Sequence, residues 1–355
     1  MRRLDPRGSS EVARSGGGRR RPTLEMVAER AGVGRGTVSR VINGSPQVSP
    51  RTREAVHNAI AELGYSPNQA ARTLVTRRTD TVALVVSEHR DRLFTDPYFA
   101  DVIRGVSSVL HERDLQLLLT TARTEGEHKK IGDYLSGSHV DGALLVSLHR
   151  DDPLPRRLEE AGVPVVHGGQ PHAADRTGGV FVDVDNAGGA RSAVRHLLDI
   201  GRRRIATIAG PQDMAAGVDR LAGYRQVMEE AGLGVDERLV TAGDFSVDGG
   251  ARAMERLLET AGDFDAVFAA SDLMAVGALR VLRERGLRVP EDVAVVGFDD
   301  TLVAQHCEPP LTTVRQPTVR MGQEMARLLA DVVIPRTGEA ESIVLDTELV
   351  VRDSA

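Results

Sequence analysis

The chain has 355 residues, 41% apolar and 27% charged, which suits two or three water-soluble domains rather than one. Its single cysteine excludes an internal disulfide framework, no apolar run approaches the ~18 residues of a membrane span, and residues 1–22 lack the apolar core of a signal peptide, so we expect a cytoplasmic protein without a membrane partner. The net charge of −6 combines +8 on residues 1–80 with −14 on the rest, which is typical of a nucleic-acid-binding module joined to a domain with another task.

Three short helices are predicted after a basic arm. Thr23 is a suitable N-cap for the first helix, and Gly32 stands where a helix usually ends in a left-handed residue. Ser49, followed by proline, is the cap signature of the third helix, which Gly64 ends. Two short helices joined by a glycine turn and closed by a third are the pattern of a helix-turn-helix. The predicted segments are a disordered arm over 1–22 and helices over 24–30, 35–43 and 50–63.

The second of these helices has the residues that a DNA-reading helix needs. Its N-terminal half would enter the major groove, where arginine donates to guanine through two N–H groups, so Arg35 and Arg40 are the expected base readers. Thr37 and Ser39 are better suited to phosphates, and Gly36 allows close approach. The alternative is a three-helix packing unit with incidental arginines. The predicted major-groove residues are Arg35, Gly36, Thr37, Ser39, Arg40 and Asn43.

This segment resembles the LacI/GalR family of bacterial transcription regulators. The resemblance is carried by TLEMVAERAGV at 23–33, GTVSRVING at 36–44 and LGYSPNQAARTL at 63–74. It implies a helix-turn-helix domain over 23–66 and a hinge helix and linker over 67–79. In the family the hinge orders when two copies pair on an operator and a leucine enters the minor groove. The matching residues here are Leu74 and, one turn earlier, Ala71, although a linker leucine can also be a packing residue.

Residues 80–355 alternate between strand and helix patterns in two series. Continuous apolar strands separated by helices predict parallel sheets covered on both faces, and hence an α/β fold of two doubly wound lobes. The lobes are predicted over about 80–182 with 316–340, and about 183–315 with 341–355. The strands are predicted over 82–87, 115–121, 142–147, 180–182, 205–209, 266–270 and 293–298. The helices are predicted over 98–113, 125–136, 187–200, 218–231, 249–260 and 272–285.

The body resembles the effector domain of the same family, which is similar to periplasmic sugar-binding proteins. Matching segments include DPYFA at 96–100, RLAGY at 220–224 and VGFDD at 296–300. The resemblance implies a small molecule bound between the lobes, at the carboxyl ends of the strands. Within the family, GRG at 34–36 and GPQDM at 210–214 look like the cellobiose-responsive repressors, which implies cellobiose or another β-glucoside or cello-oligosaccharide as the effector. The lack of tryptophan argues mildly against an oligosaccharide.

Carried over position by position, the ligand contacts fall on strand ends. Arg220 can donate to a pair of hydroxyl groups and Asp299 can accept from two. Aromatic rings are expected to stack on a sugar ring, although aromatic residues usually fill cores and Asp272 can simply cap its helix. The predicted effector-binding residues are Tyr98, Phe99, Arg220, Phe245, Ser271, Asp272 and Asp299.

The predicted function is therefore that of a repressor, released from palindromic double-stranded operator DNA by a sugar and acting as a homodimer. The chain has no leucine heptad after the last strand that would join dimers into a tetramer. Alternatives are a regulator of the same family that responds to a purine or another metabolite, a sugar-binding protein, or an enzyme. No Walker A phosphate loop and no metal-ligand spacing of histidines are present, so neither catalysis nor a cofactor nor a metal is expected.

Overall fold

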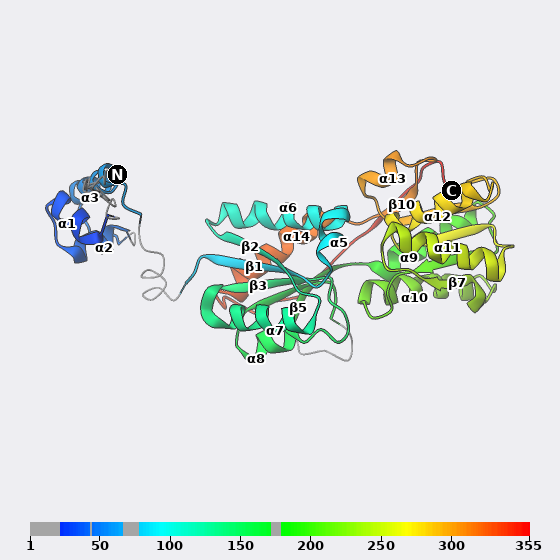
Figure 1. The fold of residues 1–355 in the computed structure, drawn as a ribbon, viewed down its shortest axis with the longest axis horizontal. Coiled ribbons are helices and arrows are strands. Elements are labelled where there is room, and N and C mark those ends of the chain that lie inside the picture. The colour runs from blue at the N-terminus through cyan, green and yellow to red at the C-terminus, as the bar shows by residue number, and fades with distance from the viewer. Residues whose placement is uncertain (1–21, 43–44, 67–77, 172–178) are drawn as a thin grey trace, which may run out of the picture. The chain divides into compact units, whose positions relative to one another are not determined.

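The structure is a computed structural model that describes residues 22–42, 45–66, 78–171 and 179–355. The contacts divide the chain into two compact units, residues 1–77 and residues 78–355, shown in Figure 1. In the first unit helices α1 (Leu24–Ala31), α2 (Arg35–Ile42) and α3 (Pro50–Leu63) agree closely with the predicted helices. The second unit begins earlier than the predicted boundary at 80. The backbone N–H groups of Thr79 and Asp80 donate to the Asp141 carboxylate at 2.6 and 3.0 Å, which fixes both residues to the body.

The first lobe of the body is built on a parallel sheet in the order β11-β5-β4-β3-β1-β2. Alternation along β1 sends Val82, Leu84 and Val86 to the face covered by α6 and α14, and Ala83 and Val85 to the face covered by α7 and α8 (Figure 1). Its strands are β1 (Thr81–Val86), β2 (Gln116–Thr121), β3 (Gly142–Val146), β4 (Val165–Gly168), β5 (Val180–Val184) and β11 (Ile343–Leu345). Its helices are α5 (Arg90–Thr95), α6 (Pro97–Glu112), α7 (Glu125–Tyr134), α8 (Leu154–Glu160) and α14 (Thr318–Arg327), with π-helical turns at Leu135–His139 and Leu328–Val333.

The second lobe repeats this layered plan with the strand order β12-β10-β9-β8-β6-β7. Only the edge pair β10–β12 is antiparallel within the part of the chain that the structure describes. Its strands are β6 (Ile205–Ala209), β7 (Val240–Ala242), β8 (Ala266–Ala269), β9 (Ala294–Asp299), β10 (Thr312–Arg315) and β12 (Glu348–Val350). Its helices are α9 (Asn186–Asp199), α10 (Ala215–Glu230), α11 (Val247–Ala261), α12 (Asp272–Glu284) and α13 (Leu302–His306), with a 3-10 turn at Glu237–Leu239.

The chain passes between the lobes later than predicted at two places. Strand β5 continues to Val184, so residues 183 and 184 belong to the first lobe and not to the second. Strand β11 pairs with β5, Leu345 opposite Val184, so the predicted assignment of 341–355 to the second lobe is wrong for residues 343–345. The reason is that a three-residue edge strand has too little pattern of its own to show which sheet it joins.

The layers of the body bring the carboxyl ends of both parallel sheets to the region where the chain passes between the lobes. The loops after the strands therefore hold the side chains that a small molecule would meet.

None of the helices in the described ranges combines the length and the apolar character of a membrane span.

Candidate functional site

The three N-terminal helices form a small core that fixes the direction of α2. Gly32 ends α1 with φ +65°, the left-handed conformation that glycine adopts without strain. The Ser49 hydroxyl accepts a hydrogen bond from the Thr52 N–H at 3.2 Å and so begins α3. Val27 and Val38 are fully buried between the helices. This unit is the helix-turn-helix that the sequence predicts.

The face of α2 opposite this core points to solvent. Arg35, Gly36 and Arg40 are exposed, and Thr37 and Ser39 are half-buried. Arg35 Nη1 lies 3.0 Å from Glu25 Oε1, and both side chains are more than half exposed. An exposed ion pair of this kind contributes about 1 kcal/mol or less, so Arg35 can exchange it for a DNA group at low cost.

Three of the predicted DNA contacts lie outside the described residues. They are Asn43, at the end of the second predicted helix, and Ala71 and Leu74 in the predicted hinge. Their roles stay predictions.

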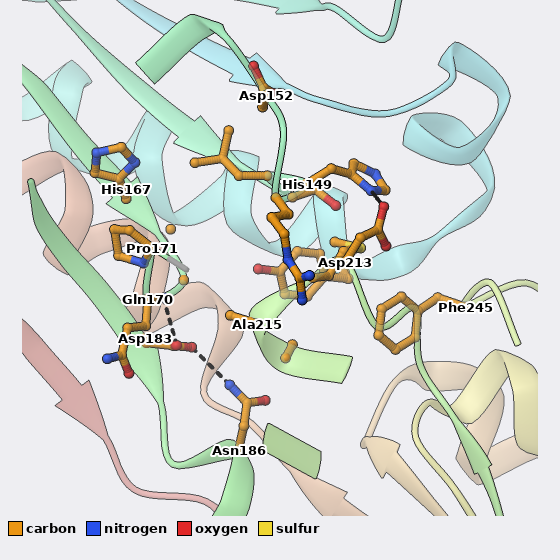
Figure 2. Close-up of a pocket in the computed structure, with 18 of the residues that line it drawn as sticks. His149, Asp152, His167, Gln170, Pro171, Asp183, Asn186, Asp213, Ala215 and Phe245 are labelled. Atoms are coloured by element: carbon orange, nitrogen blue, oxygen red, sulfur yellow. Dashed lines mark hydrogen bonds and ion pairs between the residues drawn. The ribbon is translucent and has the colours of Figure 1, made fainter. Parts of the chain in front are cut away.

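A cavity of about 370 Å³ lies at the carboxyl ends of the strands of the body (Figure 2). Loops after β3, β4 and β5 of the first lobe line it together with loops after β6, β8 and β9 of the second. Its wall is mixed, with apolar surface from Tyr98, Met214, Phe245 and Met321 beside many polar groups. Such a lining is typical of small-molecule sites.

Arg220 on α10 is the centre of the polar network in the second lobe. The side chain is only 5% exposed, and its guanidinium group stacks on the Phe298 ring at 3.6 Å from the centroid. Nε donates to Asn186 Oδ1 at 2.9 Å, and Nη1 donates to the Ala270 carbonyl at 2.6 Å and to Asp299 Oδ1 at 3.3 Å. Its bonds to the described residues use Nε and Nη1 and leave Nη2 for a ligand.

Carboxyl groups surround this network from both lobes. Asp299 Oδ1 also accepts from Gln316 Nε2 at 2.6 Å, and Asp183 Oδ1 accepts from Asn186 Nδ2 at 3.0 Å. Burial raises the pKa of Asp299 well above its ordinary value, against the opposing effect of the Arg220 charge. Burial also raises the pKa of Asp183, although backbone N–H groups donate to it. The oxygens of both carboxyl groups can accept hydrogen bonds from a ligand with hydroxyl groups.

A second polar cluster lies at another end of the cavity in Figure 2. His149 Nδ1 lies 2.7 Å from Asp213 Oδ2, and His149 Nε2 lies 3.5 Å from Glu88 Oε1. The neighbouring carboxylates, Glu88 first and then Asp213, raise the pKa of His149, against the effect of burial. Although burial alone would raise the pKa of Asp213, its hydrogen bond to His149 lowers it. The His149 imidazole therefore lies between carboxylates of both lobes and contacts one from each.

Comparison with known proteins gives a family to both units. Residues 23–68 match the family described as bacterial regulatory proteins, lacI family, and residues 194–355 match the periplasmic binding protein-like domain. The chain is 62% identical over 336 residues to the HTH-type transcriptional regulator CelR of Thermobifida fusca, which covers 95% of this chain and 99% of that protein. This chain belongs to the LacI family.

Other LacI-family proteins are similar over the same span. The HTH-type transcriptional repressor CytR of Escherichia coli is 34% identical over 335 residues, 94% of this chain and 96% of that protein. A solved CelR–cellobiose complex superposes with a TM-score of 0.77 and 60% identity, covering 94% of this chain and 100% of that one. The lac repressor dimer bound to operator and the anti-inducer ONPF superposes with a TM-score of 0.82 and 28% identity, covering 94% and 99%. The two-lobed fold and the regulator class predicted from the sequence are confirmed.

Five of the seven predicted effector residues line the cavity of this LacI-family chain. They come from both lobes, which places them around one space although the sequence separates them widely. These residues are Tyr98, Arg220, Phe245, Ser271 and Asp299.

Phe99 and Asp272 lie outside the set of described residues that line the cavity. Phe99 is 1% exposed and packs edge-on against Tyr98, on the core side of α6. Asp272 is fully buried, and its carboxylate accepts from the Thr301 N–H at 2.7 Å and from the Thr313 hydroxyl at 2.5 Å. Asp272 therefore ties α12 to the loop after β9. Ser271 caps α12 through its bond with the Met274 N–H, so its place at the cavity wall is also structural.

The sequence-based prediction missed most of the polar wall. Several missed residues lie inside segments that carry the family resemblance, so the segments pointed to the site without showing which side chains face it. The missed polar residues include Arg92, Asp96, His149, Asp183, Asn186, Asp213 and Gln316. Within the described ranges, no group of three His, Cys, Asp or Glu side chains is arranged to hold a metal ion.

Proposed function

We propose that this chain represses carbohydrate-utilisation genes by binding a palindromic operator as a homodimer. We further propose that cellobiose, or a related β-glucoside or cello-oligosaccharide, releases it. The observation that carries the proposal is one chain with an exposed arginine-bearing helix and a separate cavity lined by carboxyl, amide and guanidinium groups. The similarity to CelR, whose solved structure is a complex with cellobiose, supports the choice of sugar.

The deep polar network has the geometry to bind neighbouring hydroxyl groups. Arg220 Nη1 lies 3.3 Å from Asp299 Oδ1, so the nearby Nη2 and Oδ2 atoms present a donor beside an acceptor. A vicinal diol supplies the matching acceptor and donor. Because all these groups are largely buried and already held by protein bonds, they lose little freedom when a ligand binds.

The apolar part of the wall suits the C–H face of a sugar ring. The chain has no tryptophan, so stacking falls to Tyr98 and Phe245. Two arginines lie near the Phe245 ring, with Arg92 Cζ at 5.2 Å and Arg220 Cζ at 5.9 Å from its centroid. These contacts hold the ring in place beside the polar network.

The DNA-binding unit supplies the second half of the function. Arg35 and Arg40 are both exposed on α2, the helix proposed to enter the major groove. Two copies would read the two halves of a palindrome, as the family's dimers do. Binding to operator DNA would place the regulator at the chromosome, which agrees with the predicted cytoplasmic location.

The two functions are linked by a coupling free energy. If the sugar binds the free protein more tightly than the operator-bound protein, sugar binding must weaken operator binding by the same factor. A sugar with this preference releases the protein from the operator, whereas a co-repressor would bind the operator-bound protein more tightly. We propose the first, with no chemical change of the sugar.

The test is fluorescence anisotropy of a labelled palindromic site from the DNA upstream of the gene, titrated with cellobiose, glucose, lactose and a purine base. The proposal expects that cellobiose lowers operator binding and that the sugar is recovered unchanged. Arg220→Met should lose the response, and Arg225→Met, at a half-exposed position of the same helix, is its matched control and should keep it. Tightening by a purine would instead favour the metabolite-responsive alternative. Absence of palindrome binding, or hydrolysis of the sugar, would overturn the proposal.

A further inference from the structure

A set of contacts joins the two lobes at the His149 end of the cavity. His149 follows β3 of the first lobe, and Asp213 follows β6 of the second. Besides the 2.7 Å contact between His149 Nδ1 and Asp213 Oδ2, the Arg150 N–H donates to the Asp213 carbonyl at 2.7 Å. Arg150 Nη2 also donates to the Gln212 carbonyl at 3.3 Å. These two hydrogen bonds join the segments that carry His149 and Asp213, and so help to hold the two side chains next to each other.

The imidazole ring is fixed from behind as well. Its Nε2 faces Glu88 Oε1 at 3.5 Å, and the same oxygen accepts from the Ser147 hydroxyl at 2.9 Å and from Arg92. The His149 side chain is only 14% exposed. A ring with this many neighbours does not swing aside freely to admit a ligand.

A polar groove of about 460 Å³ lies on the other side of this pair. The groove and the cavity share three lining residues, His149, Asp152 and Asp213, so these side chains form the partition between the two spaces. The groove has the donors and acceptors that sugar hydroxyl groups need. Its remaining lining residues are Ser87, Arg123, Glu125, His128, Asp151 and Pro153.

We propose that the His149–Asp213 pair limits the length of the effector, so that the cavity accepts a disaccharide and excludes the third ring of a longer cello-oligosaccharide. Atoms 2.7 Å apart leave no room for a chain of sugar rings to pass between them. A longer effector has to break the pair and separate the lobes at this end. The inference rests on the proposed function, because it takes the effector to be a cello-oligosaccharide.

The experiment compares cellobiose with cellotriose as releasing agents for the full-length protein on its operator. In the wild-type protein, cellotriose should need a concentration at least about tenfold higher than cellobiose for half-release. His149→Ala and Asp213→Ala each remove one side of the partition and open the cavity to the polar groove. Each variant should reduce that ratio about tenfold or more. The matched control is Arg225→Met on α10, which lies outside the linings of both spaces and should keep the wild-type ratio.

Titration calorimetry with both sugars provides a second measurement that does not depend on release from DNA. The proposal is wrong if the wild-type protein responds equally to both sugars. It is also wrong if neither alanine variant binds cellotriose more tightly, relative to cellobiose, than the wild type does. Both results leave the proposed function intact. A wild-type protein that responds to no cello-oligosaccharide overturns the proposed function and the length limit together.

Discussion

Replacing Arg220 by methionine is the sharpest test of the network at the floor of the cavity. The substitution keeps an unbranched side chain but removes the charge and the bonds to Asn186, Ala270 and Asp299. Asp299 is then left without its cationic partner in a buried site. We expect both a loss of sugar response and a loss of stability.

The expected loss of stability follows from the burial of the pair. Removing one partner of a buried, hydrogen-bonded ion pair costs about 3–5 kcal/mol. Arg225→Met on the same helix is the control. In the wild-type protein Arg225 Nη1 lies 2.6 Å from Glu237 Oε1, but the side chains of Arg225 and Glu237 are 38% and 65% exposed. Exposed pairs contribute about 0–1 kcal/mol, so the two variants should differ by several kcal/mol.

The pH dependence of this difference has a definite sign. Because burial raises the pKa of Asp299, the folded protein binds a proton there more readily than the unfolded chain does. That contribution to stability is complete below the ordinary aspartate pKa and is lost as the pH rises through the raised pKa. Loss of Arg220 raises the pKa of Asp299 further, so the deficit of the variant should grow from acid to neutral pH.

The assay is urea denaturation of both variants and the wild type, followed by circular dichroism at several pH values. A second variant, Arg220→Met with Asp299→Asn, should recover part of the lost stability because it removes the uncompensated carboxyl group. The reasoning is refuted if Arg220→Met costs no more than Arg225→Met. It is also refuted if the deficit shrinks as the pH rises.

Four further outcomes are expected. Arg40→Ala should weaken operator binding by about 1–3 kcal/mol and change binding to scrambled DNA much less, measured by anisotropy; equal losses on both would contradict base reading. Gly32→Ala should cost the N-terminal unit about 1–2 kcal/mol in thermal unfolding, because its φ of +65° strains any residue with a Cβ. Gly277→Ala should destabilise the second lobe by about 1–3 kcal/mol, since the added Cβ would stand 2.0 Å from the Val247 carbonyl oxygen, and a neutral effect in denaturation would contradict this packing. Because hydrogen bonding raises the pKa of His149, its contribution to stability is complete below its ordinary pKa of about 6.5 and is lost as the pH rises through the raised value; His149→Ala should therefore cost more near pH 6 than near pH 9.

The larger elements could be predicted because their patterns are long and regular. The cap at Thr23, the stop at Gly32 and the cap at Ser49 fixed the three N-terminal helices almost to the residue. In the body, uninterrupted apolar runs such as 205–209 predicted most of the central strands. The interior strands β4 and β10 and the helices α5, α8, α13 and α14 were not predicted. The edge strands β7, β11 and β12 were missed because three residues carry too little periodicity to be recognised.

The site was predicted only in part because sequence spacing does not show which neighbour faces a cavity. Tyr98 and Phe99 are adjacent on α6, about 100° apart around the helix, and the structure sends the first to the cavity and the second to the core. Asp272 comes just after β8 and Asp299 is the last residue of β9, yet only Asp299 reaches the cavity. The His149–Asp213 contact depends on how two lobes approach, which no local pattern encodes.

The coupling between the DNA-binding unit and the cavity is the central claim, and reciprocity offers its most direct test. Titration calorimetry measures the affinity of cellobiose for the free protein and for the operator-bound protein under the same salt conditions. The proposed function predicts tighter binding to the free protein, by the same factor by which saturating cellobiose weakens operator binding. Equal affinity for the two forms would contradict it, because a ligand without preference between two states cannot shift the balance between them.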